Sequence, residues 1–162
     1  MSVRIIVDST ADMRPEVKER VEVVPLTVFF GEEEYLDGVT MDYIQFYEKL
    51  TSSDVLPTSS QPSPASFTDM YEKITAAGDS AVVITISSKL SGTYQSATIA
   101  ASDFDNICVV DSRSATIGAG CLVEYALQLV DAGKSAQEIL EELIEVRSKL
   151  KIVALIDTFE YL

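Results

Sequence analysis

Three apolar segments of this chain end in clusters of hydroxyl and carboxylate side chains, and a helix-forming pattern follows each. The segments are Val3–Thr10 (VRIIVDST), Ala81–Ser87 (AVVITIS) and Asn106–Ser112 (NICVVDS). Nearly continuous apolar residues are typical of strands that are buried on both faces, as in a parallel sheet. Their alternation with helices predicts an α/β domain whose mainly parallel sheet carries helices on both faces. The polar strand ends should then gather along one edge, where such sheets bind ligands.

Helix signals separate and follow these strands. Thr40 is a candidate N-cap for a helix over Thr40–Leu50, and Ser63 is one for a helix over Pro64–Ala77, with proline at its first position. Gly78 and Gly133 are plausible helix stops. The other predicted helices are Pro15–Arg20, one that starts within LSGTYQSATIAAS, Thr116–Ala132 and Ser135–Lys149.

The remaining segments suggest shorter elements. Pro25 bends or ends a second apolar stretch, Val21–Phe30, and GEEEYLDG after it indicates a hairpin or edge turn. The stretch TSSDVLPTSSQPSP is a loop by composition. The final KIVALIDTFEYL reads as a new strand. We therefore expect one α/β domain over residues 1–156, with 157–162 as the start of a second, C-terminal domain that is absent from this chain.

The composition excludes several partners. The formal net charge of −14 argues against nucleic acid and anionic membrane as partners of most of the surface. No apolar run approaches the ~20 residues that a membrane span needs, and the N-terminus lacks the features of a signal peptide. Cys108 and Cys121 lack CxxC spacing, which favours core packing in a reducing compartment over a metal or redox site. We expect a cytoplasmic protein.

Two hydroxyl-rich stretches are candidates for holding an anion. In LSGTYQSA, Ser91, Gly92 and Thr93 precede a helix whose free amides and dipole favour an oxyanion, although Ser91 could equally be a plain N-cap. In PTSSQPSP, prolines hold Ser59 and Ser60 in a stiff geometry, although an ordinary helix-entry loop has the same composition.

A third strand end, VVDSRSATIGAG, could support the site. Asp111, Ser112 and Ser114 supply polar groups, and Gly118 and Gly120 allow close packing of helix and sheet. Arg113 is the only cation at these strand ends; it could bind a carboxylate or phosphate, and a surface salt bridge is an equally good interpretation.

The chain lacks the residues that most catalytic sites require. It has no histidine to activate a serine, and Lys89 does not have the SxxK spacing relative to a serine. Neither GxxxxGK[ST] nor GxGxxG occurs, and no clustered Cys or His residues predict a metal site. Asp8, Asp12 and Asp111 are weak candidates for Mg²⁺. We therefore predict no catalytic residues and no cofactor.

Six stretches in order, VDSTADM, VVPLTVFFGEEEYLDGV, LPTSSQPSPASF, ISSKLSGTYQSA, VVDSRSATIGAG and LIDTFEYL, make the chain similar to the DegV family. The resemblance implies a non-enzymatic protein that binds a long-chain fatty acid such as palmitate. It also implies presentation of the fatty acid to a separate fatty acid kinase, which makes an acyl phosphate for phospholipid synthesis. The predicted domain would then bind the lipid head group.

The resemblance assigns site residues. The family's Thr-Ser-Gln-Pro loop falls on Ser59, Ser60, Gln61 and Pro62, so Ser59 would contact the fatty-acid carboxylate. A second hydroxyl falls on Ser91, with the amides of Gly92 and Thr93 beside it. The arginine and histidine that the family supplies from its second domain have no counterpart here. Apolar candidates for the tail lining are Phe29, Phe67, Met70 and Ile117.

Two other functions remain open at this stage. A phosphotransfer enzyme domain is an alternative because related dihydroxyacetone kinase-like folds phosphorylate small ketoses. A pure interaction module, in which the acidic surface binds a basic partner, is another.

Overall fold

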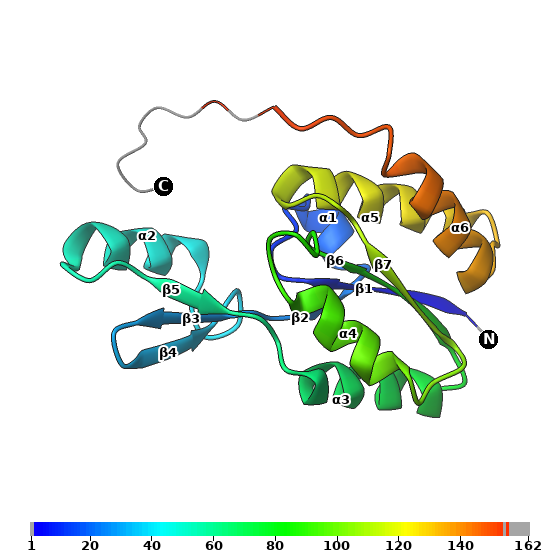
Figure 1. Cartoon of the computed structure of the whole chain (residues 1–162), viewed down its shortest axis with the longest axis horizontal. Coiled ribbons are helices and arrows are strands. Elements are labelled where there is room, and N and C mark those ends of the chain that lie inside the picture. Colours follow the sequence, from blue (N-terminus) through cyan, green and yellow to red (C-terminus); the bar gives the residue numbers. More distant parts are fainter. Residues whose placement is uncertain (1, 154, 156–162) are drawn as a thin grey trace.

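A computed structural model describes residues 2–153 and 155 (Figure 1). Its larger part, which we call the body, contains a four-stranded parallel sheet in the order β2-β1-β6-β7. The strands are β1 (Val3–Asp8), β2 (Glu22–Val24), β6 (Ser80–Thr85) and β7 (Ile107–Asp111). The predicted α/β architecture is confirmed.

Helices cover both faces of this sheet (Figure 1). One face packs against α1 (Pro15–Lys18), α5 (Thr116–Asp131) and α6 (Ala136–Val146), and the other against α3 (Pro64–Ala76) and α4 (Thr93–Ala101). Side chains alternate between the two cores: Ile5 and Val7 of β1 face α5, whereas Ile6 faces α3. Apolar residues follow one another in these strands without polar alternation because both faces of the sheet are buried.

A smaller part, which we call the lobe, extends to one side of the body (Figure 1). It is an antiparallel sheet in the order β4-β3-β5 with one helix, α2. Its elements are β3 (Thr27–Phe30), β4 (Glu33–Leu36), α2 (Tyr43–Ser52) and β5 (Thr58–Ser60). The hairpin predicted at GEEEYLDG is confirmed. Pro25 separates β2 from β3, so the second apolar stretch contributes to both sheets.

The lobe differs from the sequence predictions in two places. The segment predicted as a loop contains β5, which forms because β3 offers a free edge: Val28 pairs with Ser59. The predicted N-cap at Thr40 is also wrong. Asp42 caps α2, accepting a hydrogen bond from Gln45 N at 2.8 Å in a capping box, while Thr40 Oγ1 accepts one from Leu36 N at 2.8 Å.

The other helix boundaries agree closely with the sequence. Ser63 caps α3, and Ser135 caps α6 in a capping box with Glu138. Gly78 and Gly133 adopt φ of 76° after their helices, a conformation that favours glycine. The described residues of the closing stretch, 151–153 and 155, form no strand, and 157–162 lie outside the described residues.

The structure also tests the predictions for the two cysteines and for membrane-spanning segments. Cys108 is half-buried as expected, but Cys121 is exposed on α5, so the prediction of core packing fails for it. Every helix among the described residues is too short or too polar to cross a membrane.

Candidate functional site

Asp8 holds together the ends of two central strands. Its carboxylate accepts hydrogen bonds from Ile86 N at 2.7 Å, beyond β6, and from Thr10 N at 3.0 Å. Thr10 Oγ1 donates a third. Asp8 is fully buried, and this burial raises its pKa although the hydrogen bonds oppose the shift. Its contacts are therefore structural: Asp8 orders the edge on which the hydroxyl-rich segments lie.

Ser91, Gly92 and Thr93 form the turn that begins α4. Gly92 occupies the N-cap position, and Ser91 Oγ instead lies 2.9 Å from Thr93 Oγ1 and accepts a hydrogen bond from Thr93 N at 3.3 Å. The interpretation of Ser91 as the N-cap is therefore wrong. Thr93 is fully buried and Ser91 half-buried, so Ser91 is the hydroxyl that a ligand can reach.

Gln61 links the loop after β5 to this turn. Its Nε2 donates to Ser96 Oγ of α4 at 3.1 Å. Its Oε1 would lie 2.2 Å from a Cβ at Gly92, so the glycine leaves room for the amide of Gln61. The two hydroxyl-rich segments, separated in the sequence, are thus in contact through Gln61. The family resemblance aligns Gln61 but implies no role for it.

Ser59 and Ser60 point to opposite faces of the lobe sheet because they are adjacent in β5. Ser59 faces α2 and borders a groove of about 520 Å³. Ser60 borders a different groove, of about 490 Å³, together with Gln61. The structure therefore does not bring the two serines to one point. The 520 Å³ groove is lined by Thr10, Leu26, Val28, Asp37, Tyr43, Phe46, Tyr47, Pro57, Thr58 and Ser59.

The four predicted tail-lining residues do not lie together. Phe67 is fully buried in the body core, with its ring centroid 6.0 Å from that of Tyr71. Met70 borders the 490 Å³ groove, and Phe29 is half-buried in β3. Ile117 is 69 % exposed on α5. The pattern that marked them as apolar could not place them around one cavity.

Asp111 organises the third strand end. Its carboxylate accepts hydrogen bonds from Ser88 Oγ at 2.6 Å and Arg113 N at 2.9 Å. Burial opposes its ionisation, but these hydrogen bonds hold the pKa of Asp111 below its ordinary value. Arg147, from the end of α6, donates to the Asp111 carbonyl. Sequence reasoning missed Arg147 because nothing local connects it to a residue 36 positions earlier.

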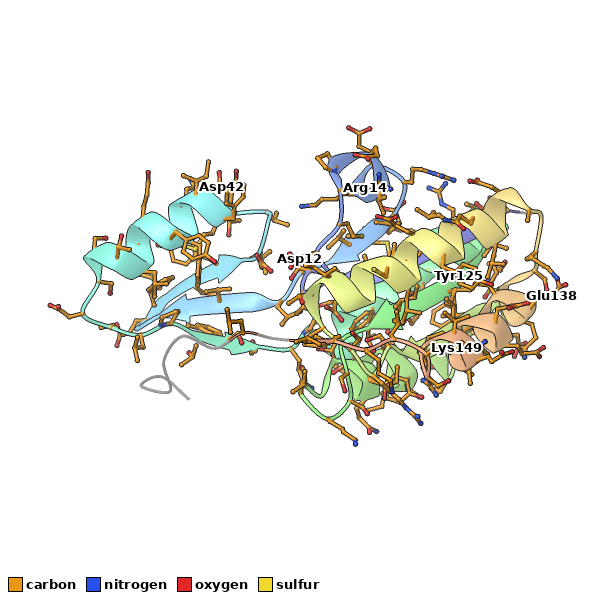
Figure 2. The ribbon with its side chains drawn as sticks, turned by 90° about the horizontal axis from the view of Figure 1, so that it is seen from above. Asp12, Arg14, Asp42, Tyr125, Glu138 and Lys149 are labelled. Carbon is orange, nitrogen blue, oxygen red and sulfur yellow. The ribbon has the colours of Figure 1, made fainter. Side chains whose placement is uncertain are left out.

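The carboxylates weighed for Mg²⁺ do not form a metal site. Asp8 and Asp111 are engaged at different strand ends, and Asp12 lies near the start of α5 (Figure 2). Among the described residues, no group of three His, Cys, Asp or Glu side chains could hold a metal ion.

The chain was compared with known proteins. It is 37 % identical over 153 residues to a DegV domain-containing protein of Clostridium perfringens, covering 92 % of this chain and 55 % of that relative. It is 33 % identical over 167 residues to protein DegV of Bacillus subtilis, covering 100 % of this chain and 59 % of the relative. The chain thus spans little more than half the length of these relatives.

Solved structures have the same fold. A fatty-acid-binding DegV family protein from Thermus thermophilus matches with a TM-score of 0.82 and 34 % identity, over 91 % of this chain and 54 % of that one. A stearic-acid-binding protein from Eubacterium ventriosum matches with a TM-score of 0.79 and 31 % identity, over 89 % and 52 %. The model of the DegV family, described as uncharacterised proteins, matches residues 2–162. The chain belongs to the DegV family.

Proposed function

We propose that this chain binds a long-chain fatty acid such as palmitate, with the carboxylate near Ser59 and Ser91. Similarity to solved fatty-acid-binding and stearic-acid-binding proteins supports the ligand class. The observation that carries the proposal is the contact of Gln61 with Gly92 and Ser96, because it joins the end of β5, the strand that bears Ser59, to the turn that bears Ser91. Hydroxyls and free amides suit a single carboxylate, as hydrogen bonds to a charged group are strong.

The amides at the start of α4 support the same head-group position. Tyr94 N and Gln95 N make no backbone hydrogen bond outside the helix within the described part of the chain. The first-turn amides of a helix have no partners inside it, and the dipole favours negative charge at this end. We assign Gly92 and Thr93 to the same cradle, and Ser60 to its outer side because β5 turns that side chain to the other face.

We propose the 520 Å³ groove as the path of the acyl tail. Its size lies within the range of about 300–1,000 Å³ that is typical of small-molecule sites. Its apolar lining comes from the lobe, where Tyr43 and Tyr47 of α2 are 74 % and 61 % exposed. Covering such surface with a tail contributes about 0.8 kcal/mol per buried methylene group. Phe67 and Met70 would then contribute to packing of the body more than to the tail contact, and Phe29 and the exposed Ile117 would lie outside this path.

We further propose that the chain does not transform the fatty acid but presents it to a fatty acid kinase, which supplies acyl phosphate for phospholipid synthesis. The absence of histidine from the whole chain supports this division of labour, since neither Ser59 nor Ser91 has the usual base that would make it a nucleophile. The part of the relatives beyond this chain would complete the head-group site.

Binding of isotope-labelled palmitate to the purified 162-residue chain tests the proposal. Ser91→Ala should weaken binding by about 1–3 kcal/mol, because a hydrogen bond to a charged group is lost. Ser102→Ala, at the exposed far end of α4, is the matched control and should leave the affinity unchanged. No palmitate binding by the unmodified chain, or equal affinities for the two variants, would contradict the proposal.

A further inference from the structure

The turn between β7 and α5, residues 112–116, combines features that no fatty-acid role explains. Arg113 and Thr116 adopt φ of 53° and 48°, and they are the two non-glycine residues with positive φ in the described chain. Such conformations are uncommon outside glycine and persist when surrounding contacts hold them. Here Asp111 supplies a contact, accepting from Arg113 N at 2.9 Å.

Two arginines lie at this turn, and both contact Asp111. Arg147 donates through Nη1 to the carbonyl of Asp111, and Arg113 follows Asp111 by two residues. Neither makes a salt bridge within residues 2–153. The other three arginines of the chain all do, in the pairs Arg4–Glu22, Arg14–Glu124 and Arg20–Asp131.

The two guanidinium groups also repel each other. Burial, and then the charge of Arg113, lower the pKa of Arg147, while Asp111 acts in the opposite direction. The nearby Asp111 carboxylate is already engaged by Ser88. Within the described residues of this acidic chain, Arg113 and Arg147 are thus the two arginines that make no salt bridge.

Buried donors without partners lie in the same place. Ser114 Oγ and Arg147 Nε are the two buried side-chain polar atoms that find no hydrogen-bond partner in the described part of the chain. Ser114 is only 5 % exposed. Leaving such groups unpaired is costly, so each calls for an explanation such as an absent ion.

The hydroxyl of Ser114 lies against Gly118 near the start of a long helix, where the side chain of Ile152 also packs. Its Oγ lies 2.0 Å from the position that a Cβ would take at Gly118, in the first turn of the sixteen-residue α5. Thr116 N and Ile117 N make no backbone hydrogen bond outside the helix within the described residues, and both residues are exposed. Free first-turn amides and the helix dipole attract an anion.

We propose that the β7–α5 turn is a second anion site, which binds a phosphate group through Arg113, Arg147, Ser114 and the first amides of α5. Two guanidinium groups match the charge of a phosphate dianion, and their planar donors match its oxygens. The single charge of a fatty-acid carboxylate needs no such pair. The site is independent of the proposed fatty-acid function, because it uses other residues and a different ligand.

Titration of the 162-residue chain with inorganic phosphate tests the site. Amide NMR signals of the turn should shift saturably at constant ionic strength, and chloride should not reproduce the shift. Arg113→Gln should weaken phosphate binding about tenfold, because one charge-assisted interaction is lost. Arg20→Gln removes an exposed, ion-paired arginine and should change phosphate affinity less than about twofold.

A second variant, Ser114→Ala, separates binding from stability, and a second ligand, octylphosphonate, distinguishes free phosphate from a lipid phosphate. Ser114 Oγ makes no hydrogen bond in the structure, so its removal should leave thermal stability unchanged or higher while phosphate binding weakens. Shifts at the turn with both anions indicate a free phosphate ligand, and shifts with octylphosphonate alone indicate a lipid phosphate. Either result supports the site if Arg113→Gln weakens the binding. No shift with either anion, or equal shifts in wild type and Arg113→Gln, overturns it.

Discussion

The body buries its apolar side chains, whereas the lobe leaves many of its apolar side chains exposed. In the body, Ile6, Val83 and Phe67 have no exposed surface. In the lobe, α2 has no buried residue, and the three residues of β5 are all exposed. The body closes its core on both faces of one sheet, whereas the lobe covers only one face of its sheet with a single helix. Apolar surface that a fold leaves open in this way is characteristic of a binding region.

The largest expected contrast is between two phenylalanines on helices. Phe67→Ala in the body should cost about 3–5 kcal/mol of unfolding free energy, because a fully buried ring is removed. Phe46→Ala in the lobe should cost about 1 kcal/mol or less, although its ring lies 5.7 Å from that of Phe30. Urea denaturation measures both. Equal losses would show that the lobe is as tightly packed as the body.

Replacing two glycines by alanine should also have different effects on stability. A Cβ at Gly120 would lie 2.0 Å from the carbonyl oxygen of Asp12, so Gly120→Ala should destabilise the body by about 1–3 kcal/mol. A Cβ at Gly92 would meet only the movable end of Gln61, so Gly92→Ala should cost little stability.

The cost of Gly92→Ala should appear in ligand binding instead. Displacing Gln61 separates the loop after β5 from α4, so palmitate affinity should fall about tenfold, the equivalent of one charge-assisted hydrogen bond. Thermal denaturation and palmitate titration, run on both variants, separate the two effects. A Gly92→Ala chain with unchanged affinity would remove Gln61 from the site.

Helix caps should give a smaller effect that again differs between the two parts. Ser135→Ala removes the cap of α6 in the body and should cost about 1 kcal/mol of global stability. Asp42→Ala removes the equivalent cap of α2, which Figure 2 shows at the end of the helix nearest the body. Because the lobe has few buried contacts, loss of this cap should speed hydrogen exchange of the α2 amides and leave the global unfolding transition almost unchanged.

The smallest expected effect is on pH dependence, and it concerns the body alone. Burial raises the folded-state pKa of Asp8 above its ordinary value of 3.8, so the folded chain binds this proton more tightly than the unfolded chain. The contribution of Asp8 to stability therefore falls as pH rises from 3.8 through the raised pKa. Wild type should lose stability relative to Asp8→Asn across this window in urea titrations. A difference that is constant with pH would contradict the shift.

Most of the body could be predicted from the sequence because its signals are local. The apolar strands, the caps at Ser63 and Ser135 and the glycine stops after two helices each depend on residues close in the chain. The ordered motifs identified the family for the same reason. The serines of the candidate site were found in this way, although their roles remain predictions.

The remaining features depend on contacts between distant segments, and local pattern does not encode these. The Ser-rich segment predicted as a loop pairs with β3 through Val28 and so forms β5. This pairing turns the side chains of Ser59 and Ser60 to opposite faces of the sheet. A capping box favoured Asp42 over Thr40 as the N-cap of α2. Arg147 reached Asp111 only because α6 packs against β7. The sequence by itself determined the strands of the body, most of the helices and the polar strand ends. The tertiary structure decided that β5 exists and which polar segments lie close together, since long-range packing alone sets their positions.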